Sequence, residues 1–286
     1  MHLFDGDPLD DLIRLALRED IGAGDLTTEA TIPKEARGSA VAVAKSELVL
    51  AGVDAARRVF QILDPSVTFT ARHNDGDKLS PGDLAFELHG SLRSLLIGER
   101  TALNFVQRLC GIATLTAQAT AALEGTRTRL LDTRKTTPGW RALEKRAVRA
   151  GGGHGHRTSL ADGVMIKDNH IAAAGSITLA VQRAKAYSHP LVKVEVEVKN
   201  LDEVREALAA GAEMLLLDNM TDAQLAEAVR VVAGRVPTEA SGNMNVARLA
   251  KVAACGVDYV SMGALTHSAP AADISLAISR VEGASR

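Results

Sequence analysis

Positively charged side chains are concentrated between residues 134 and 167. This segment holds eight lysine or arginine residues and two acidic residues, although the 286-residue chain carries a formal charge of −2. Four of the cations follow predicted strands or lie in a glycine-rich loop: Arg134, Lys135, Arg157 and Lys167. Guanidinium groups bind carboxylates and phosphates through paired hydrogen bonds. The cluster therefore predicts a pocket for a small ligand with several negative charges.

Other roles are open to the lysines and arginines of this region. Arg141, Lys145 and Arg149 are spaced four residues apart, which is typical of a solvent-exposed helix face. A lysine in a barrel pocket can also form a Schiff base with a carbonyl substrate, and Lys167 or Lys193 would be the candidate. These alternatives predict a solvated surface and an aldolase-type reaction, respectively.

A glycine-rich loop at 151–157 carries two histidines. His154 and His156 could begin a zinc site, but no cysteine and no well-spaced third ligand accompanies them in the sequence. The three consecutive glycines could bind phosphate through their backbone N–H groups, although the Gly-Lys-Ser/Thr sequence of a Walker loop is missing. We therefore interpret the loop as an anion-binding candidate rather than a metal site.

Polar residues follow each of six predicted strands in the second half of the chain. The strand candidates are 129–131, 164–166, 191–198, 214–217, 238–240 and 259–261. The polar residues at their ends are Asp132, Lys167, Glu197, Asp218, Ser241 and Ser261. Because parallel strands place their carboxyl ends at one edge of a sheet or barrel, we expect these side chains to share one pocket.

The third of these strands has an alternating pattern of charge. Lys193, Glu195 and Glu197 alternate with valines, so the three charges share one face of the strand. Either a solvated edge strand or a strand that lines a polar barrel interior would show this pattern. In the second case Glu197 reaches the pocket, where it and Asp218 can hold sugar hydroxyls, bind Mg²⁺ or stabilise a developing cation.

The last two strands lead into candidate phosphate sites. The turns at 241–243 and 261–263 leave a strand and precede a helix, which is the usual phosphate position in α/β barrels. His267 follows the second turn, and we expect it to be a structural loop histidine rather than a ligand or base. Together with the cationic pocket, these turns predict transfer chemistry on a phosphorylated sugar.

Helical segments alternate with the six strands. Residues 201–210, 222–233 and 246–254 have helical spacing, and Gly211 and Gly256 follow two of them as expected C-terminal stops. Alternation of this kind predicts a parallel sheet, and six strands predict an incomplete α/β barrel. An open doubly wound sheet is the rival, but no G-x-G-x-x-G sequence follows the first strand.

The first part of the chain has a different pattern. We expect an acidic amphipathic helix within the first 30 residues, followed by short strands at 40–44, 67–71 and 84–88. Residues 91–123 then predict a long helix that Gly111 bends or divides. The change of pattern near residue 125 predicts two domains.

Composition excludes several classes of protein. The balanced charge and an aromatic content of 3% argue against a nucleic-acid or anionic-membrane binder. Cys110 and Cys255 cannot make a disulfide framework, and we expect both to be buried thiols. The N-terminal segment lacks a signal-peptide pattern and no apolar run is long enough to span a bilayer, so we expect a soluble cytoplasmic protein.

Short motifs match one enzyme family in order along nearly the whole chain. They are 17–20 (LRED) with 24–28 (GDLTT), 99–105 (ERTALNF) with 111–114 (GIAT), 132–139 (DTRKTTPG), 151–153 (GGG) with 156–157 (HR), 166–170 (IKDNH), 194–197 (VEVE), 217–220 (LDNM), 239–242 (EASG) and 263–268 (GALTHS). On these motifs the chain resembles the quinolinate phosphoribosyltransferase family, also called carboxylating nicotinate-nucleotide pyrophosphorylase.

The resemblance implies a two-domain α/β architecture. Residues 1–125 would form an N-terminal α/β sandwich domain that includes the long helical segment 91–123. Residues 126–286 would form a C-terminal incomplete α/β barrel with about six parallel strands, which is the catalytic domain. An N-terminal helix and a C-terminal helix would pack across the boundary.

The resemblance also implies a reaction. Such an enzyme is a pentosyltransferase that joins quinolinate to phosphoribosyl pyrophosphate (PRPP), with Mg²⁺ as cofactor. The products are nicotinate mononucleotide, pyrophosphate and CO2, and the reaction belongs to NAD biosynthesis. The family assembles as a homodimer or a higher oligomer, in which Arg100 of one subunit reaches into the site of the other.

Residue roles are carried over from the matching motifs. The residues implied to bind quinolinate are Arg100, Thr133, Arg134, His156, Arg157 and Lys167. Those implied to bind PRPP are Lys135, Glu197, Asp218, Ser241, Gly242, Asn243, Ser261, Met262 and Gly263. The residues implied to be catalytic are Lys135, Lys167, Glu197 and Asp218, and Glu197 and Asp218 would also bind the metal, mostly through pyrophosphate.

The chain departs from the family pattern at three positions. Gly155 stands where asparagine is usual, Ser159 where glycine is common, and Cys110 where serine is common. The first two flank the His156–Arg157 pair and so bear on carboxylate binding. The alternatives to quinolinate phosphoribosyl transfer are a related protein of the same fold with a different acceptor, such as the molybdenum-locus homologue, a passive phosphate-binding barrel, and the aldolase.

Overall fold

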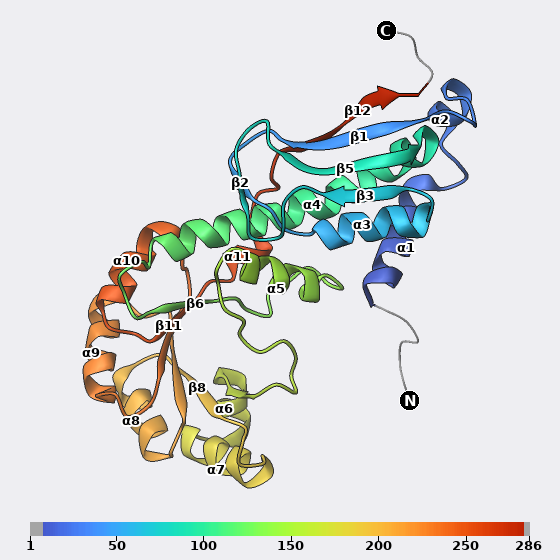
Figure 1. The fold of residues 1–286 in the computed structure, drawn as a ribbon. Helices are drawn as coiled ribbons and strands as arrows, with labels where there is room; N and C mark the ends of the chain where they lie inside the picture. Colours follow the sequence, from blue (N-terminus) through green and yellow to red (C-terminus); the bar gives the residue numbers. More distant parts are fainter. Residues whose placement is uncertain (1–7, 283–286) are drawn as a thin grey trace. The chain divides into compact units, whose positions relative to one another are not determined.

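The computed structural model describes residues 8–282 and divides into two compact units. Within the described chain, the first unit comprises residues 8–115, 149–151 and 269–282, and the second comprises 116–148 and 152–268. The acidic segment predicted within the first 30 residues is described from Pro8 onward, where it forms a helix. Figure 1 shows the two units in blue to green and in green to orange, respectively, with the red C-terminal strand in the first.

The first unit is built on a four-stranded antiparallel sheet in the order β12-β1-β5-β3. Alternate residues of β1 are buried, as expected for a strand with one face on a core. Helix α3 contacts α1 and strand β3, which gives the α/β layering that the resemblance implied. The elements of this unit are α1 (Pro8–Ile21), α2 (Leu26–Thr31), β1 (Arg37–Ala44), β2 (Leu48–Val49), α3 (Val53–Leu63), β3 (Thr68–Ala71), β4 (Lys78–Leu79), β5 (Leu84–Ser91) and β12 (Ile274–Val281).

A single long helix, α4 (Leu92–Ala121), follows β5. Gly111 does not divide this helix, as one of the two predicted alternatives had it, because α4 runs through it without interruption. A Cβ atom at Gly111 would lie 1.9 Å from the backbone oxygen of Pro270. The glycine therefore allows the C-terminal segment to approach the helix closely.

The second unit contains a six-stranded parallel sheet in the order β6-β11-β10-β9-β8-β7. All six predicted strands are confirmed, and β6 and β7 are the two edges, so the sheet is an incomplete barrel. Its strands are β6 (Arg129–Leu131), β7 (Val164–Ile166), β8 (Val194–Val198), β9 (Met214–Asp218), β10 (Thr238–Ser241) and β11 (Tyr259–Ser261).

Most helices of the second unit bury an apolar face, and the exception is α6 (Asp168–Ala174), which has no buried residue. Leu225, Ala228 and Val232 of α9, for example, lie inside the unit, and Thr221 caps that helix through its hydroxyl. Gly211 and Gly256 follow α8 and α10 with positive φ, as predicted for helix stops. The helices are α5 (Arg141–Ala150), α6 (Asp168–Ala174), α7 (Ile177–Tyr187), α8 (Leu201–Ala209), α9 (Asp222–Val232), α10 (Val246–Ala254) and α11 (Ala264–His267).

Two expectations about the chain's organisation need correction. The predicted C-terminal helix is instead β12, which pairs with β1 because its backbone completes the edge of the first sheet. Residues 269–282 therefore belong with the first unit, whereas the prediction placed all of 126–286 in the barrel. The division between the units also falls within α4, after Leu115, rather than near residue 125.

Two smaller expectations concern β8 and the thiols. β8 lies between β7 and β9, so it is an interior strand and not a solvated edge. Cys110 is buried and free, burial raises the pKa of its thiol to about 12, and Cys255 is only partly buried. Among the described helices, none combines the length and apolar character that a membrane crossing needs.

Candidate active site

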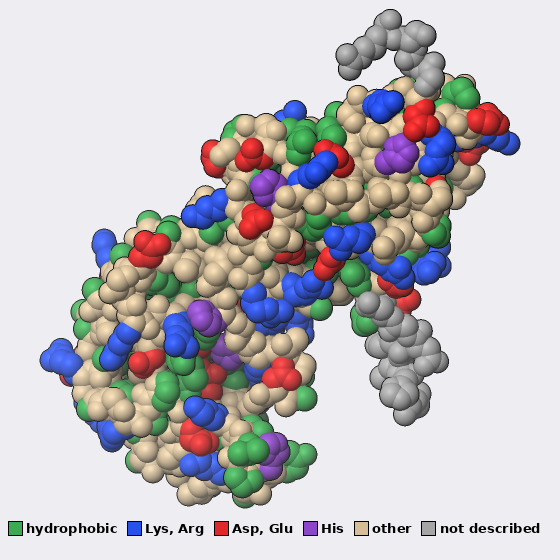
Figure 2. All heavy atoms as spheres, viewed as in Figure 1, with side chains coloured by type: hydrophobic (Ala, Val, Ile, Leu, Met, Phe, Trp, Pro, Cys, Tyr) green, Lys and Arg blue, Asp and Glu red, His purple; other side chains and the backbone are tan. Residues whose placement is uncertain are grey.

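A cavity of about 760 Å³ opens at the carboxyl ends of the six strands of the second unit. Figure 2 shows basic, acidic and histidine side chains close together on the visible face of this unit. The residues that line the cavity are Thr133, Arg134, Lys135, His156, Arg157, Met165, Lys167, Glu197, Leu216, Asp218, Asn219, Glu239, Ser241, Gly242, Asn243, Met244, Ser261, Gly263, Ala264 and His267. The shared pocket predicted from the strand ends is therefore present.

Cations gather on the part of the cavity that follows β6 and β7. The Nε of Arg134 is buried and has no hydrogen-bond partner within residues 8–282. Burial lowers the pKa of Arg157, and the neighbouring charge of Arg134 lowers it further. Lys167 reaches toward Glu197, with Nζ 3.3 Å from Oε2. Two guanidinium groups that repel each other in a half-buried pocket are arranged to receive an anion.

His156 stands between two buried carboxylates. Its Nε2 lies 3.4 Å from Oε2 of Glu195 and 3.3 Å from Oε2 of Glu239. Burial lowers the pKa of His156, but the hydrogen bonds and charges of the two carboxylates outweigh burial and raise the pKa to about 10. The Arg157 backbone N–H donates to Nδ1 of the ring (2.7 Å) and opposes the second proton, but two negative charges beside Nε2 outweigh this one bond.

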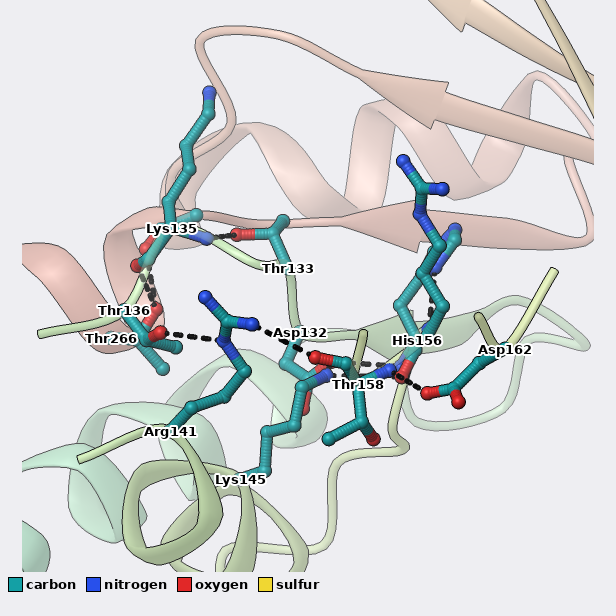
Figure 3. A network of polar contacts seen from close by, with 12 residues as sticks. Asp132, Thr133, Lys135, Thr136, Arg141, Lys145, His156, Thr158, Asp162 and Thr266 are labelled. Atoms are coloured by element: carbon teal, nitrogen blue, oxygen red, sulfur yellow. Dashed lines mark hydrogen bonds and ion pairs between the residues drawn. The ribbon is translucent and has the colours of Figure 1, made fainter. Parts of the chain in front are cut away.

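The backbone of His156 is held from behind by a second buried ion pair. Asp132 follows β6 and is fully buried, and Lys145 of α5 donates to its Oδ1. The prediction that Lys145 lies on a solvated helix face is wrong, because its side chain is only 3% exposed and points at Asp132. Figure 3 shows this pair against the His156 segment.

The loop after His156 is fixed by local polar contacts. Arg141 donates to the Thr136 hydroxyl (3.0 Å) and to the Thr158 carbonyl (3.0 Å), as seen in Figure 3. The Asp162 carboxylate accepts the backbone N–H groups of Thr158 (2.6 Å) and Ser159 (2.9 Å). These bonds lower the pKa of Asp162. Arg141, predicted on a solvated face, therefore supports the loop.

Carboxylates occupy the ends of β8 and β9. Glu197 and Asp218 are half-buried and line the cavity, and Asp218 accepts a hydrogen bond from the Asn219 amide (2.9 Å). Glu195 lies two residues before Glu197 on the same face of β8, deeper in the sheet. The polar barrel interior predicted from the alternating strand is therefore confirmed for both glutamates, whereas Lys193 is exposed before the strand begins.

The turn after β10 is shaped by a glycine. Gly242 has φ +94°, and a Cβ there would lie 2.2 Å from the Asn219 side-chain oxygen. Asn243 also has positive φ and donates to the same Asn219 oxygen (3.2 Å). Ser241 accepts a hydrogen bond from the Ser261 hydroxyl (3.0 Å), which joins the ends of β10 and β11. The two predicted phosphate turns therefore lie side by side.

The turn after β11 packs against Lys135. A Cβ at Gly263 would lie 3.0 Å from Cδ of Lys135 and 3.1 Å from Nε2 of His267. The Thr266 hydroxyl donates to the Lys135 carbonyl (2.7 Å), as Figure 3 shows. Glycine at this position leaves room for both side chains at the cavity wall.

Most residues predicted from the sequence meet in this cavity, with two exceptions. Arg100 is exposed on α4 in the first unit and does not line the cavity, which second-unit residues form. Met262 has a buried side chain, and its backbone N–H donates to the Leu131 carbonyl (3.1 Å). The cross-subunit role of Arg100 stays a prediction.

Sequence reasoning missed several residues at the site. His267, which we expected to be a structural loop histidine, is exposed and lines the cavity. Glu239 was quoted only as part of a motif, although an acid in a short strand between buried residues was a signal. The other missed lining residues are Met165, Leu216, Asn219, Met244 and Ala264, and nothing in their types separates them from ordinary packing residues.

A cluster of metal-ligating type forms around His156. Its Nε2 and one oxygen each of Glu195 and Glu239 lie within 4.8 Å of one another. Because the two carboxylates raise the pKa of His156 to about 10, Nε2 carries a proton between them and has no lone pair for a metal. The cluster therefore suits a proton rather than Zn²⁺, and the predicted partner His154 is not part of it.

Comparisons with known proteins agree with these motifs. The model of the quinolinate phosphoribosyl transferase N-terminal domain matches residues 25–110, and that of the C-terminal domain matches 112–277. A probable nicotinate-nucleotide pyrophosphorylase (carboxylating) from Bacillus subtilis is 44% identical over 258 residues, 90% of this chain and 89% of its own length. Quinolinate phosphoribosyltransferase (decarboxylating) 1b of Nicotiana tabacum is 43% identical and covers 93% of this chain and 81% of its own length.

Solved structures show the same architecture. The crystal structure of NadC from Streptococcus pyogenes matches with a TM-score of 0.90 at 45% identity, over 96% of this chain and 98% of that one. The nicotinate-nucleotide pyrophosphorylase from Francisella tularensis gives a TM-score of 0.89 at 40% identity, over 96% of each chain. The chain belongs to the quinolinate phosphoribosyltransferase family of enzymes.

Proposed function

We propose that the chain catalyses the transfer of phosphoribose from PRPP to quinolinate, with loss of CO2, to give nicotinate mononucleotide and pyrophosphate. One observation carries the proposal. A group of cations after β6 and β7 faces two carboxylates after β8 and β9 across one cavity. A dianionic acceptor requires the first group, and a developing ribosyl cation requires the second.

The acceptor subsite consists of the cations. Arg134, Arg157 and Lys167 each offer donors to a carboxylate, and the unpartnered Nε of Arg134 is supporting evidence. His156 adds a positive charge held by Glu195 and Glu239. Thr133 lies beside these residues at the cavity wall and would add a hydroxyl. Two acceptor carboxylates are thereby bound without free rotation of the ring between them.

The donor subsite consists of the carboxylates and the two turns. Glu197 and Asp218 would hold the ribose hydroxyls, and Lys135 would bind the pyrophosphate. The 5′-phosphate would lie at the turns after β10 and β11, where Gly242 and Gly263 let backbone approach the ligand. The residues assigned to this phosphate are Ser241, Gly242, Asn243, Ser261 and Gly263, with only the backbone of Met262.

Mg²⁺ fits the donor subsite. Glu197 and Asp218 supply two half-buried carboxylates at the cavity wall, and Mg²⁺ is commonly bound by one or two carboxylates together with substrate phosphates. Bound there, the ion would neutralise charge on the pyrophosphate. Lys167 lies close to Glu197 and would keep that carboxylate oriented.

The chemistry follows from the charge distribution. When the C1–pyrophosphate bond breaks, its electron pair leaves with pyrophosphate, and Glu197 and Asp218 stabilise the positive charge left on the ribose. The pyridine nitrogen then donates its lone pair to C1. The resulting pyridinium accepts the electron pair of the adjacent C–CO2 bond, so CO2 leaves and a proton takes its place. The cations hold the remaining carboxylate throughout.

An assay of the purified protein tests the proposal. Quinolinate, PRPP and Mg²⁺ are mixed and both CO2 and nicotinate mononucleotide are measured. Equal amounts of the two products are expected. A related enzyme with another acceptor would leave quinolinate unconsumed, an aldolase would be trapped by borohydride with a carbonyl substrate, and a passive barrel would bind PRPP without turnover.

A pair of lysine variants sharpens the test. Lys167→Ala removes a donor at the cavity and is expected to lower kcat/KM by roughly 100-fold or more. Lys193→Ala removes an exposed lysine before the same sheet and is expected to leave kcat/KM unchanged. Arg134→Ala should behave like Lys167→Ala, and near-normal kcat/KM in both cavity variants would contradict the assignment.

The assembly and location are also proposals. A homodimer would bring Arg100 of one subunit to the cavity of the other, and its exposure on α4 is compatible with that role. Mixing inactive Arg100→Ala and Lys167→Ala proteins should restore part of the activity, and no recovery would contradict the shared site. The cytoplasmic location stays a prediction.

A further inference from the structure

We propose that the buried Asp132–Lys145 ion pair is a positioning device that sets the place of His156 and Arg157 and thereby the KM for the acceptor. The identity of the acceptor rests on the proposed function, but the geometry does not. Asp132 is 0% exposed and Lys145 is 2% exposed, and neither residue lines the cavity. The pair therefore acts on the site through the His156 segment.

The ion pair binds both backbone groups of one residue. The His156 N–H donates to Oδ1 of Asp132 (2.8 Å), and Nζ of Lys145 donates to the His156 carbonyl (3.0 Å). Lys145 also donates to Oδ1 of Asp132, which closes the arrangement. The anion thus holds the N–H and the cation holds the C=O, so the two charges match the dipole of the backbone that they hold.

The backbone of Asp132 adds a further contact to the same segment. Its N–H donates to the His154 carbonyl (3.0 Å), and His154 donates to the Leu130 carbonyl (2.9 Å). The segment 154–156 therefore extends the edge of the sheet beside β6 and is tied to it at three positions. Arg157 follows directly, so its guanidinium is placed by the same bonds.

Burying an ion pair at this place costs free energy of folding, so its presence calls for a role. Two charges lose their hydration on burial, and an apolar pair of similar volume is often equally stable. An apolar pair could not bind the N–H and C=O of His156, which Asp132 and Lys145 now hold in a part-buried place. The geometry indicates that the role of the ion pair is to position His156 and Arg157.

The position of the pair predicts a selective kinetic effect. His156 and Arg157 belong to the acceptor part of the cavity, whereas Glu197, Asp218 and the two turns extend from other strands. Loss of Lys145 should therefore raise the KM for quinolinate and leave the KM for PRPP nearly unchanged. A merely structural role would lower the amount of active enzyme without this separation.

The test compares Lys145→Met with Arg149→Met, an exposed position one turn later on α5. Lys145→Met is expected to lower kcat/KM for quinolinate by about 100-fold, the effect of a displacement of about 1 Å at a reacting site. The kcat/KM for PRPP should change by less than about twofold, because PRPP would contact the residues after β8 to β11 and not the His156 segment. Arg149→Met should match the wild type. Equal changes for both substrates in Lys145→Met would overturn the proposal.

A second measurement does not depend on the reaction. Amide hydrogen exchange at His156, followed by NMR, should accelerate in Lys145→Met relative to the amide of Val196 in the interior strand β8. Asp132→Asn keeps the volume and removes the charge, and serves if Lys145→Met does not fold. Unchanged exchange at His156 in the folded variants would overturn the proposal even if the protein had no phosphoribosyl transfer activity.

Discussion

Two pairs of buried charged side chains meet at His156, one behind its backbone and one beside its ring. Asp132 and Lys145 carry opposite charges and hold the backbone. Glu195 and Glu239 carry like charges and face Nε2 from within the sheet. Within residues 8–282, one oxygen each of Asp132 and Glu195 and both oxygens of Glu239 lack a hydrogen-bond partner, although Oε2 of Glu239 forms an ion pair with His156 (3.3 Å).

The two pairs therefore differ in what they control: the first sets the position of the His156 backbone, and the second sets the charge of its ring. The first pair is compensated, so it can be fully buried and act as a rigid support. The second has two negative charges that share His156, with a smaller contribution from Arg157, and burial raises the pKa of Glu195 although both cations oppose the shift. Burial also raises the pKa of Asp132, although Lys145 opposes the shift. Two acids around one imidazole are costly for folding, and such costs are typically retained at functional sites. We infer that the backbone support serves stability as well as geometry, whereas the acids serve the charge of His156.

The largest expected effect comes from breaking the compensated pair. Lys145→Met leaves Asp132 as an uncompensated buried charge and is expected to lower the free energy of unfolding by about 3–5 kcal/mol. Urea unfolding measures the change, with Arg149→Met as the exposed control. The double variant Asp132→Asn, Lys145→Met should recover part of the loss, because no charge is left unpaired. A loss below about 1 kcal/mol would mean that the pair is not compensated as described.

The next effect concerns pH. The pKa of His156 is raised to about 10, above its unfolded value of 6.5, so the folded protein holds this proton more tightly than the unfolded chain. The resulting stabilisation is complete below about pH 6.5 and is lost as the pH rises through about 10. Over that range the free energy of unfolding should fall by up to ~1.4 kcal/mol per pH unit from this group.

The control for this pH effect is His156→Asn, which has no proton to lose. Unfolding is measured at several pH values in both proteins, and the wild type is expected to show the steeper fall. Parallel curves would show that the two glutamates do not hold a charged imidazole. That outcome would also remove His156 from the cations of the acceptor subsite.

A smaller effect of opposite sign is expected from the acid pair. Glu239→Gln removes one of two like charges and leaves His156 with one carboxylate. The free energy of unfolding is expected to rise by about 1 kcal/mol, because a buried charge without hydrogen bonds is removed. The pKa of His156 should fall, since one of the charges that raises it is gone. Glu19→Gln, at an exposed position on α1, is the matched control. A loss above about 2 kcal/mol in Glu239→Gln would contradict the comparison.

The fold was predictable where the sequence pattern is local. Most of the six parallel strands are short apolar runs, β8 alternates valine with glutamate, and each of the six was predicted to within a few residues of its bounds. The edge strand β12 was not, because residues 274–281 alternate weakly and only pairing with β1 makes them a strand. The close packing at Gly111 could not be predicted for the same reason, because its neighbour Pro270 lies far along the chain.

The site was predictable where a residue follows a strand. Lys167, Glu197 and Asp218 were found by that rule, because the carboxyl ends of parallel strands meet. Lys145 could not be found, since spacing along a helix does not reveal which face is buried against a loop. Glu195 and Glu239 differ from surface acids only in depth, which the pairing of β8, β9 and β10 determines.

The smallest expected effect comes from Ser159, in the loop that follows His156 and Arg157. Ser159 replaces the glycine common in the family, and its backbone φ is not in the positive region, so serine fits without strain. Its hydroxyl donates to Asp162 (3.0 Å) and accepts the Ala161 N–H (3.1 Å). Ser159→Gly is expected to lower stability by less than about 1 kcal/mol and to raise the KM for quinolinate only a few-fold, because Asp132 and Lys145 still hold His156. Steady-state kinetics with urea unfolding measures both. An effect as large as that of Lys145→Met would mean that the exposed bonds of the loop, and not the buried ion pair, set the position of Arg157.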